Sequence, residues 1–454
     1  MKKKLSILLA LAVIIAAFLS VGALAAPENA TEIYVGGNGA SDSYNGLSPK
    51  APVETLGKVS DIISESSNSD FVVYVMADIT ATSSLRTWNK NVTLMSYGND
   101  IYTITRGDDF EIASDQARSG YNPALIESNG SSADSASLAL YNITLDDGGK
   151  HAGEYFIQAD SEGDGETVFG NLTIDNTSIV QDAIIATYNG VSNITLGSGT
   201  TLKNFGGMSA VRISGGELIM EAGSKIIDDE SITRTKGAAI TGASDSLYGP
   251  AGAVWLQGGT INMEADSEIV DIDGRAIYNE GGVAAIDGTI SGVNSSSAMW
   301  QETSGAVMHM RGNAKATFGS GSVVDGDGVT LNGAGIAVLG GCELTMDFGS
   351  LITGYNAGNV LDVGGTAYLN GEITGLTGSG HAIVAQSSSN HYIRIGETAN
   401  IHHNICGYGV IYTQGNNGEI HIYGKLNDNI STDRGGALVL ANNGNHVEAY
   451  MYDG

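Results

Sequence analysis

One pattern of 19 residues returns along most of this chain and limits how it can fold. The stretch 253–271 reads AVWLQGGTINMEADSEIVD, and it lies over 210–228 without a gap and over 337–354 after a one-residue offset. Three sets of positions coincide, namely Leu218, Ile261 and Leu344, then Met220, Met263 and Met346, then Ser224, Ser267 and Ser350. Apolar residues two apart, followed by small turn residues, predict short strands joined by tight corners.

The Met220 position serves as a marker that can be followed along the chain. It passes through Leu94, Leu145, Ile174, Leu196, Met220, Met263, Phe318, Met346, Ile395, Ile422 and Ala449. The intervals fall into groups of 22–29 and 43–55 residues, as single and double steps of one repeat would give. Such a period is typical of a solenoid, in which each unit buries its apolar face against its neighbours. We therefore predict an all-β parallel β-helix with roughly fourteen or fifteen turns between Leu94 and Ala449.

The composition fits a chain with many tight corners between short strands, and it excludes several classes of protein. The chain has 64 Gly and only five Pro, and charged residues make up 16%. A net charge of −29 argues against a nucleic-acid partner, because phosphate binding needs clustered Lys and Arg. The two cysteines, Cys342 and Cys406, rule out a disulfide-stapled fold and favour two buried thiols, with a single bridge as the alternative.

The first residues predict export. Three Lys follow Met1, an apolar run spans 5–24, and Ala23-Leu24-Ala25 ends it. This order is typical of a secretory signal peptide over residues 1–25, so we expect a secreted or cell-surface protein. The apolar run is also long enough to span a bilayer, so an uncleaved anchor is the alternative and the only route to a membrane.

The rest of the chain divides into an N-terminal cap and the β-helix. Residues 26–68 contain a strand and then an amphipathic helix in the segment 55–64, with Leu56, Val59, Ile62 and Ile63 on one face and Thr55 as its N-cap. Residues 69–454 are assigned to the β-helix, interrupted by protruding loops at 106–137, 160–166 and 232–250. The last coil carries no cap, which predicts a truncated natural chain or an edge that pairs with another molecule.

The opening of the chain resembles a known family. The run IYVGGNGASDSYNGLSPKAPVETLGKVSDII, residues 33–63, is similar to the start of secreted bacterial right-handed parallel β-helix proteins of the pectin-lyase-like superfamily. The resemblance implies a right-handed coil. It leaves the function open, because that superfamily includes lyases, hydrolases, isomerases, tail spikes and non-catalytic surface proteins.

The catalytic motifs of that superfamily are incomplete in this chain. The polygalacturonase type carries Asn-Thr-Asp, Asp-Asp, Gly-His-Gly and Arg-Ile-Lys, whereas this chain offers Asn176-Thr177-Ser178, Gly380-His381-Ala382 and Arg394-Ile395-Gly396. Each departs at a decisive position. Two carboxyl pairs, Asp271 with Asp273 and Asp325 with Asp327, match the spacing of roughly 6.5–9.5 Å that inverting hydrolysis needs. Both lie in D-x-D-G corners, which favours turn residues, so no catalytic residue is assigned.

Two groups of residues have the chemistry of metal ligands. Asp160, Glu162 and Asp164 place oxygen ligands at alternate positions before Gly165, as at the start of a calcium loop, but the twelfth position is Asn171. This favours an acidic surface loop without a cofactor, with weak Ca²⁺ binding as the alternative. His402, His403 and Cys406 carry the ligand types of Zn²⁺. Strand periodicity places His403 on the opposite face from His402, which favours ordinary surface histidines.

Trp255 is the candidate contact for a ligand. It alternates with Val254 and Leu256, so it points outward if those two are core residues, and packing under a loop is the competing interpretation. The predicted function is that of a rigid, non-catalytic, adhesin-like or envelope-structural module that binds an extracellular glycan or surface protein through its flat faces. The alternative is a polysaccharide lyase or glycoside hydrolase that acts on an acidic glycan.

Overall fold

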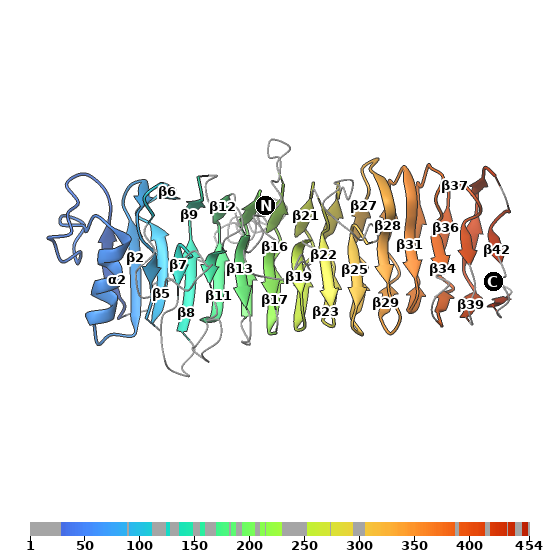
Figure 1. The fold of residues 1–454 in the computed structure, drawn as a ribbon, viewed down its shortest axis with the longest axis horizontal. Coiled ribbons are helices and arrows are strands. Elements are labelled where there is room, and N and C mark those ends of the chain that lie inside the picture. Colours follow the sequence, from blue (N-terminus) through green and yellow to red (C-terminus); the bar gives the residue numbers. More distant parts are fainter. Residues whose placement is uncertain are drawn as a thin grey trace, which may run out of the picture.

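The chain forms a long stack of parallel strands with a helix at one end (Figure 1). The computed structural model describes residues 29–88, 90–110, 124–127, 136–148, 155–158, 169–180, 183–187, 193–204, 209–213, 215–228, 252–272, 274–293, 305–385, 390–413, 418–433, 435–440 and 447–452. In these residues successive coils lie side by side along the long axis. The predicted parallel β-helix is confirmed.

Each coil passes through three sheets in turn, here named A, B and C. Sheet A comprises β1 (Thr31–Val35), β2 (Asp70–Val75), β5 (Asn91–Ser96), β8 (Ala136–Tyr141), β11 (Phe169–Asp175), β14 (Asn193–Leu196), β17 (Glu217–Met220), β20 (Thr260–Met263), β23 (Val283–Ile286), β26 (Lys315–Phe318), β29 (Glu343–Met346), β32 (Thr366–Leu369), β35 (Tyr392–Ile395), β39 (Gly418–Ile422) and β43 (Val447–Met451). Sheet B comprises β3 (Ile79–Ala81), β6 (Tyr102–Arg106), β9 (Ile143–Asp146), β12 (Ser178–Val180), β15 (Thr201–Lys203), β18 (Lys225–Ile227), β21 (Glu268–Val270), β24 (Thr289–Ser291), β27 (Val323–Asp325), β30 (Leu351–Thr353), β33 (Glu372–Thr374), β36 (Asn400–His402) and β40 (Lys425–Asn427).

Sheet C completes the coil. It comprises β4 (Leu85–Arg86), β7 (Ile126–Glu127), β10 (Tyr155–Gln158), β13 (Ala183–Thr187), β16 (Ser209–Ile213), β19 (Gly252–Leu256), β22 (Ile277–Glu280), β25 (Met308–Arg311), β28 (Thr330–Val338), β31 (Ala357–Val363), β34 (Ile383–Ala385), β38 (Ile411–Thr413) and β42 (Leu438–Leu440). A short fourth ladder joins β37 (Ile405–Cys406) to β41 (Ile430–Ser431). The predicted loop 106–137 contains strand β7 of sheet C, whereas 160–166 and 232–250 lie outside the described residues.

The register of sheet A corrects the marker series in detail. Met220 pairs with Met263 across one step, so this 43-residue interval is a single coil and not a double one. Ile286 lies between Met263 and Phe318, where a double step was predicted. Ile286, and likewise Leu369 between Met346 and Ile395, confirm double steps, whereas Leu140 replaces Leu145 in the column and Met451 replaces Ala449. Within the residues that the structure describes, sheet A has 13 strands from β5 to β43, fewer than the predicted turns, because coil length varies with the segments between strands.

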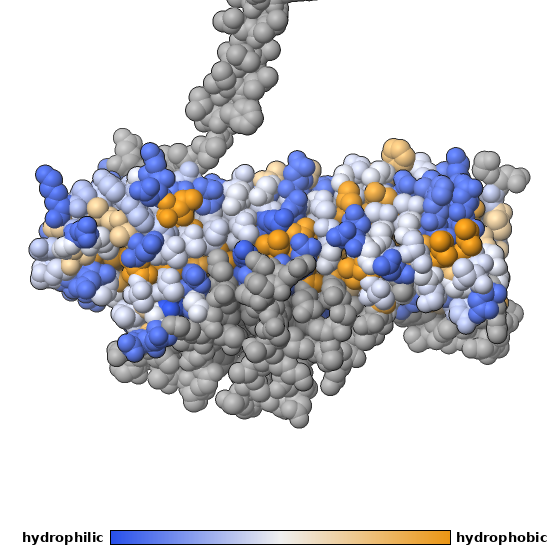
Figure 2. Space-filling model, turned by 90° about the horizontal axis from the view of Figure 1, so that it is seen from above, coloured by the Kyte–Doolittle hydropathy of each residue, from blue (hydrophilic) through white to orange (hydrophobic). Residues whose placement is uncertain are grey.

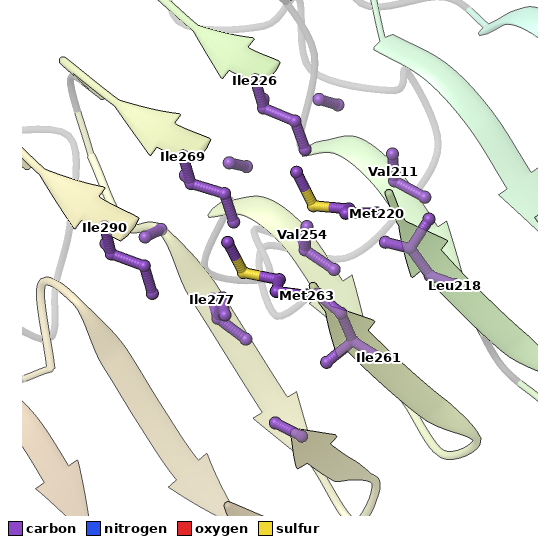
Figure 3. Packing of buried hydrophobic residues seen from close by; sticks show 14 of the residues in the cluster. Val211, Leu218, Met220, Ile226, Val254, Ile261, Met263, Ile269, Ile277 and Ile290 are labelled. Atoms are coloured by element: carbon purple, nitrogen blue, oxygen red, sulfur yellow. The ribbon is translucent and has the colours of Figure 1, made fainter. Parts of the chain in front are cut away.

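The core runs through the middle of the stack and consists of aliphatic side chains from all three sheets. Figure 3 shows Met220 and Met263 at equivalent places in neighbouring coils, with Ile226 and Ile269 across from them. Both methionines are fully buried. Because each side chain lies against the same position of the next coil, the core has no boundary between repeats, which is how a solenoid is stabilised.

The helix α2 (Leu56–Glu65) covers the end of the stack that carries β1 (Figure 1). The side chain of Thr55 accepts a hydrogen bond of 3.1 Å from the backbone N–H of Lys58, so the predicted N-cap is confirmed. Leu56, Val59 and Ile63 are buried against the core, and Ile62 is partly buried. The helix therefore closes the apolar interior that the first coil would otherwise leave open.

The corners between sheets A and B repeat one local structure. The hydroxyl of Ser267 donates to the backbone carbonyl of Glu264 at 2.7 Å, and Ser224 and Ser350 do the same in their coils. The residue before each serine has a positive φ, as at Asp266 with φ 64°. Gly, Asn and Asp tolerate this conformation best, which explains why the aligned repeats place Gly or Asp there.

Charged groups lie mostly at the surface, and Arg106 and Asp147 are among the buried exceptions. A guanidinium nitrogen of Arg106 lies 3.2 Å from a carboxylate oxygen of Asp147, and both side chains are at most 1% exposed. The view from above Figure 1 shows a largely hydrophilic surface with small, separate hydrophobic spots (Figure 2). Cys342 and Cys406 are both free and buried. No helix within the described ranges is long and apolar enough to cross a membrane.

Candidate functional site

The predicted calcium residues cannot be placed. Asp160, Glu162 and Asp164 lie outside the described residues, as does Asp273. In the part of the chain that the structure describes, no group of three or more His, Cys, Asp or Glu side chains is arranged to hold a metal ion. Calcium binding by Asp160, Glu162 and Asp164 therefore stays a prediction.

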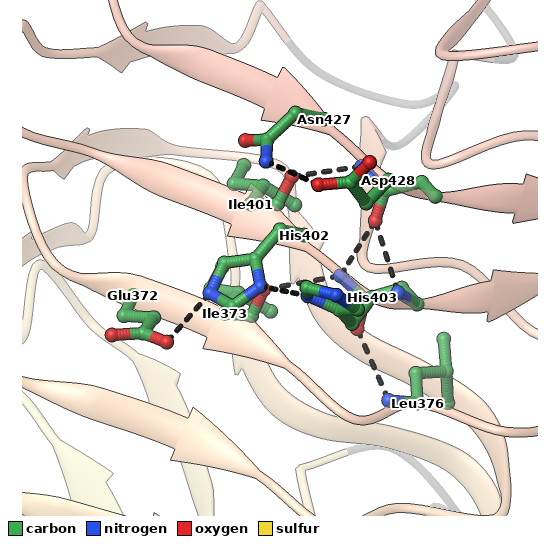
Figure 4. Close-up of polar contacts among 10 residues, drawn as sticks. Glu372, Ile373, Leu376, Ile401, His402, His403, Asn427 and Asp428 are labelled. Carbon is green, nitrogen blue, oxygen red and sulfur yellow. Dashed lines mark hydrogen bonds and ion pairs between the residues drawn. The ribbon is translucent and has the colours of Figure 1, made fainter.

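The histidines near Cys406 form a surface cluster, while the thiol lies in the core. His402 Nε2 lies 2.6 Å from a carboxylate oxygen of Glu372, one coil away, and the His402 and His403 Nδ1 atoms are 2.5 Å apart (Figure 4). The two rings therefore do not lie on opposite faces as predicted, because His403 follows the strand with φ 52° and turns back. Cys406 is fully buried, and burial raises the pKa of its thiol to about 11. Histidine and thiolate ligands do not converge here.

Beside this cluster, two asparagines tie neighbouring coils together. The amide of Asn404 donates to the carbonyl of Ile373 at 3.0 Å and accepts from the backbone N–H of Leu376 at 3.0 Å, among the contacts of Figure 4. Asn429 repeats this one coil later by donating to the carbonyl of Ile401. Asn404 is fully buried, so its amide satisfies backbone groups that water does not reach. This arrangement holds a corner in shape and has no catalytic geometry.

The described aspartates of the two candidate pairs act as corner residues. Asp325 accepts a hydrogen bond of 2.9 Å from the backbone N–H of Asp327, which itself has φ 45°. Asp271 likewise occupies a left-handed corner, with φ 55°. These are the contacts of turn residues, as the D-x-D-G pattern indicates.

The three residues that matched fragments of the polygalacturonase motifs lie apart in the fold. Asn176 sits at the corner between β11 and β12 and donates to the Asn142 side chain at 2.9 Å. His381 precedes β34 in sheet C and stacks on Tyr412, with ring centroids 4.8 Å apart. Arg394 belongs to sheet A and pairs with Glu397 at 2.9 Å. Because they belong to different sides of the coil, they do not form one site.

Trp255 points away from the core but is not an open platform. Its neighbours Val254 and Leu256 belong to the core, as predicted, whereas the Trp255 side chain is only 7% exposed. The Arg212 guanidinium lies 4.2 Å from the centroid of the Trp255 ring, and that ring meets Tyr278 edge-on at 6.1 Å. Arg212 and Tyr278 thus contact the indole from the two neighbouring strands of sheet C. The role of Trp255 as a ligand contact stays a prediction.

The strands around Trp255 continue this column. Arg212, Trp255, Tyr278 and His309 occupy the same outward position in β16, β19, β22 and β25. Tyr278 is fully buried and stacks on His309 with centroids 5.4 Å apart. Such a filled column stabilises the outer side of sheet C through ring and cation–π contacts, and it presents little surface to a ligand.

An open group of rings, which sequence reasoning missed, lies on the outer side of sheet A over β32, β35, β39 and β43. We call it the tyrosine–histidine face, and it consists of Tyr368, Tyr392, His421, Tyr423, Tyr450 and Tyr452. Strand alternation explains its direction, because Ile393, Ile420 and Ile422 fill the core and leave the intervening residues outside. In register, His421 pairs with Tyr450, whereas Tyr392 pairs with Thr366 and Glu419 and meets the rings of Tyr368 and His421 diagonally.

The rings of the face form a continuous contact series. Ring centroids are 5.9 Å apart for Tyr368 and Tyr392, 5.3 Å for Tyr392 and His421, and 4.8 Å for His421 and Tyr450. Tyr423 and Tyr452 stack in parallel at 4.1 Å. Tyr450 and Tyr452 are 40% and 43% exposed, so the face is open to solvent at these two rings.

Polar groups border the rings and engage them. His421 Nε2 lies 3.2 Å from a carboxylate oxygen of Glu419, and His421 Nδ1 lies 3.1 Å from the Tyr452 hydroxyl. The Tyr450 hydroxyl donates to the Glu448 carboxylate, and this bond together with the Glu448 charge raises the pKa of the Tyr450 phenol. A hydrogen bond with Tyr423, followed by burial, raises the pKa of Tyr452. Both phenols therefore stay protonated at neutral pH.

Arg394 is the cation of the face. Its guanidinium lies 4.7 Å from the centroid of the Tyr423 ring and 2.9 Å from the Glu397 carboxylate. The backbone N–H of Glu397 donates a hydrogen bond to the Glu397 carboxyl, and this bond, followed by Arg394, holds the pKa of that carboxyl below its usual value. The positive charge of Arg394 is thus held by both a carboxylate and a ring.

A sequence signal for the face existed. The segments YIRI, EIHIY and EAYMY each alternate apolar residues with Tyr, His, Arg or Glu, and they stand at corresponding places in successive coils. Alignment of the outward positions places His421 beside Tyr450 and Tyr423 beside Tyr452, with Tyr392 two residues before the His421 column.

The comparisons with known proteins are sparse. No family model matches the chain, and no curated protein matches it. Among solved structures, a GH136 lacto-N-biosidase from Eubacterium ramulus is 9% identical, with a TM-score of 0.19 over 90% of this chain and 68% of that chain. This likeness is too weak to support an inference about function.

Proposed function

We propose that this protein is a secreted or cell-surface β-helix module, adhesin-like and non-catalytic, that binds an extracellular glycan through the tyrosine–histidine face. The observation that carries the proposal is the series of rings across four coils, open at Tyr450 and Tyr452 and bordered by Glu419, Glu448 and Arg394. Export is proposed from the signal-peptide pattern of residues 1–25. From the resemblance of residues 33–63, we also propose that the chain belongs to the pectin-lyase-like superfamily.

A flat row of aromatic rings suits a sugar chain for physical reasons. The faces of a pyranose ring carry C–H groups that pack against aromatic rings, and its edges carry hydroxyls that need hydrogen-bond partners. The face offers both, because phenol and carboxylate oxygens lie at the margins of its rings. The rings follow one another from β32 to β43 with centroids 4.8 to 5.9 Å apart, so they form a series that an extended polymer can follow.

The non-catalytic part of the proposal rests on the incomplete motifs and on how the carboxylates are used. Asp271 and Asp325 shape corners, and the carboxylates of the face are engaged by His421, Tyr450 and Arg394. The alternative, a polysaccharide lyase or hydrolase, predicts release of new reducing or unsaturated ends.

The test is binding of the purified protein to a panel of plant, mucin and bacterial polysaccharides by affinity electrophoresis, with product release measured in the same samples. We expect retardation by at least one polysaccharide and no product. Tyr452→Ala is expected to weaken binding about tenfold, because a central aromatic contact carries much of the energy of such sites. Tyr44→Ala is the matched control, since Tyr44 is also 43% exposed but lies in the N-terminal cap.

Two results would overturn the proposal. Product formation from any polysaccharide would show that the protein is an enzyme and not a non-catalytic binding module. Equal retardation of the wild type, Tyr452→Ala and Tyr44→Ala would show that the glycan does not bind at the tyrosine–histidine face.

A further inference from the structure

The hydrogen bonds of the tyrosine–histidine face fix which chemical groups it offers to a ligand. A carboxylate only accepts hydrogen bonds, so the contact between Glu419 and His421 requires the proton to be on Nε2 of His421. In the neutral ring Nδ1 is then an acceptor, and the Tyr452 hydroxyl donates to it at 3.1 Å. The hydrogen bond with Tyr423 then occupies one lone pair of the Tyr452 oxygen, and the other lone pair is left for a ligand.

Tyr450 is arranged in the same way. Its hydroxyl donates to Glu448, so this phenol also uses its proton within the protein. The raised pKa of Tyr450 agrees with a proton held by its bond to Glu448. At the open part of the face, ligands therefore meet acceptors, namely two phenol oxygens and the carboxylates.

The charge of the face points the same way. Glu419 and Glu448 are paired in register on β39 and β43, so two carboxylates stand about one strand spacing, roughly 4.8 Å, apart. Glu419 is 54% and Glu397 68% exposed. Among the described residues of β32, β35, β39 and β43, Arg394 is the one Lys or Arg, and Glu397 already pairs with it. A like-charged ligand would meet repulsion here, within a chain of net charge −29.

Building on the proposed glycan binding, we propose that the tyrosine–histidine face selects a glycan with protonated amino groups, such as a glucosamine polymer, and rejects polyuronates. The ammonium group supplies donors to Glu419, Glu448 and the phenol oxygens. The electron-rich faces of Tyr450 and Tyr452 attract the same cation. Sugar C–H groups cover the remaining ring surface, as they do for any glycan on this face.

The experiment compares three oligosaccharides of equal length by calorimetric titration at pH 7 and low salt, namely β-1,4-linked glucosamine, its N-acetylated counterpart and galacturonate. We expect glucosamine to bind roughly three- to tenfold more tightly than the acetylated form, and galacturonate not to bind. The preference for glucosamine should shrink at 0.5 M NaCl, because exposed charges are screened.

Variants separate the charge selection from the binding itself. The double variant Glu419→Gln, Glu448→Gln is expected to bring the ratio of the two affinities close to one while the acetylated form still binds. Tyr452→Ala should weaken both. Tighter binding of galacturonate, or a ratio unchanged in the double variant, overturns the amino-sugar proposal. If the wild type binds none of the three and no polysaccharide of the wider panel, glycan binding itself is wrong.

Discussion

Replacing Met263 with Asp tests the register of the whole stack. The Met263 side chain is fully buried and lies between Met220 and Ile286 of the neighbouring coils. Removing such a side chain from a packed core costs roughly 2–5 kcal/mol. A carboxyl group buried without a partner adds several kcal/mol more. The sum is at least about 5 kcal/mol, which approaches the entire stability of an ordinary domain.

The assay is urea unfolding followed by the β-sheet circular dichroism signal, with size-exclusion chromatography to detect aggregation. Asn262→Asp is the matched control, because Asn262 is the adjacent residue on β20, is only half-buried and faces outward. Met263→Leu should cost less than about 1.5 kcal/mol, since it nearly conserves volume. Wild-type-like unfolding of Met263→Asp, or equal damage from Asn262→Asp, would refute the register.

Three further predictions test other parts of the fold. Asp147→Ala leaves the buried Arg106 without its carboxylate and should lower the free energy of unfolding by roughly 3–5 kcal/mol in urea titrations; a loss below 1 kcal/mol would mean that the pair is solvated. Asn404→Ala should cost about 1–3 kcal/mol and speed amide exchange at Leu376, whereas unchanged exchange would contradict the asparagine contact. Burial, and then the Asp325 charge, raise the pKa of the Tyr355 phenol, so stability should be complete below pH 10 and fall as pH rises further. Tyr355→Phe should lessen that fall in urea titrations at pH 8, 10 and 11, and equal falls in both proteins would count against this cause.

The inward-facing half of the fold could be predicted from the sequence. Leu218 and Met220 alternate into the core because strand geometry sends residues two apart to the same side. Thr55 caps a helix for a local reason, which a single sequence contains. The turn count was too high because a 43-residue interval fits either two short coils or one coil with a long insertion, and only the pairing of Met220 with Met263 decides between them.

The candidate site was harder to predict from the sequence than the core, because it depends on contacts between coils. The direction of Trp255 follows from alternation, but its burial depends on Arg212 and Tyr278, which lie in other coils. His403 departs from alternation because a left-handed residue reverses the chain. The tyrosine–histidine face escaped notice because its rings stand far apart in sequence and meet only when the outward register is known.

The parallel ladders also determine how this rod answers a mechanical load. Hydrogen bonds between strands run along the long axis, so tension applied along that axis loads the coils in series, and the weakest junction opens first. Ile286 follows Met263 by 23 residues, so releasing that coil exchanges one strand spacing for roughly 75 Å of slack chain. A molecule of this design yields in steps under force and dissipates work at each one, while the coils beyond the break keep their shape.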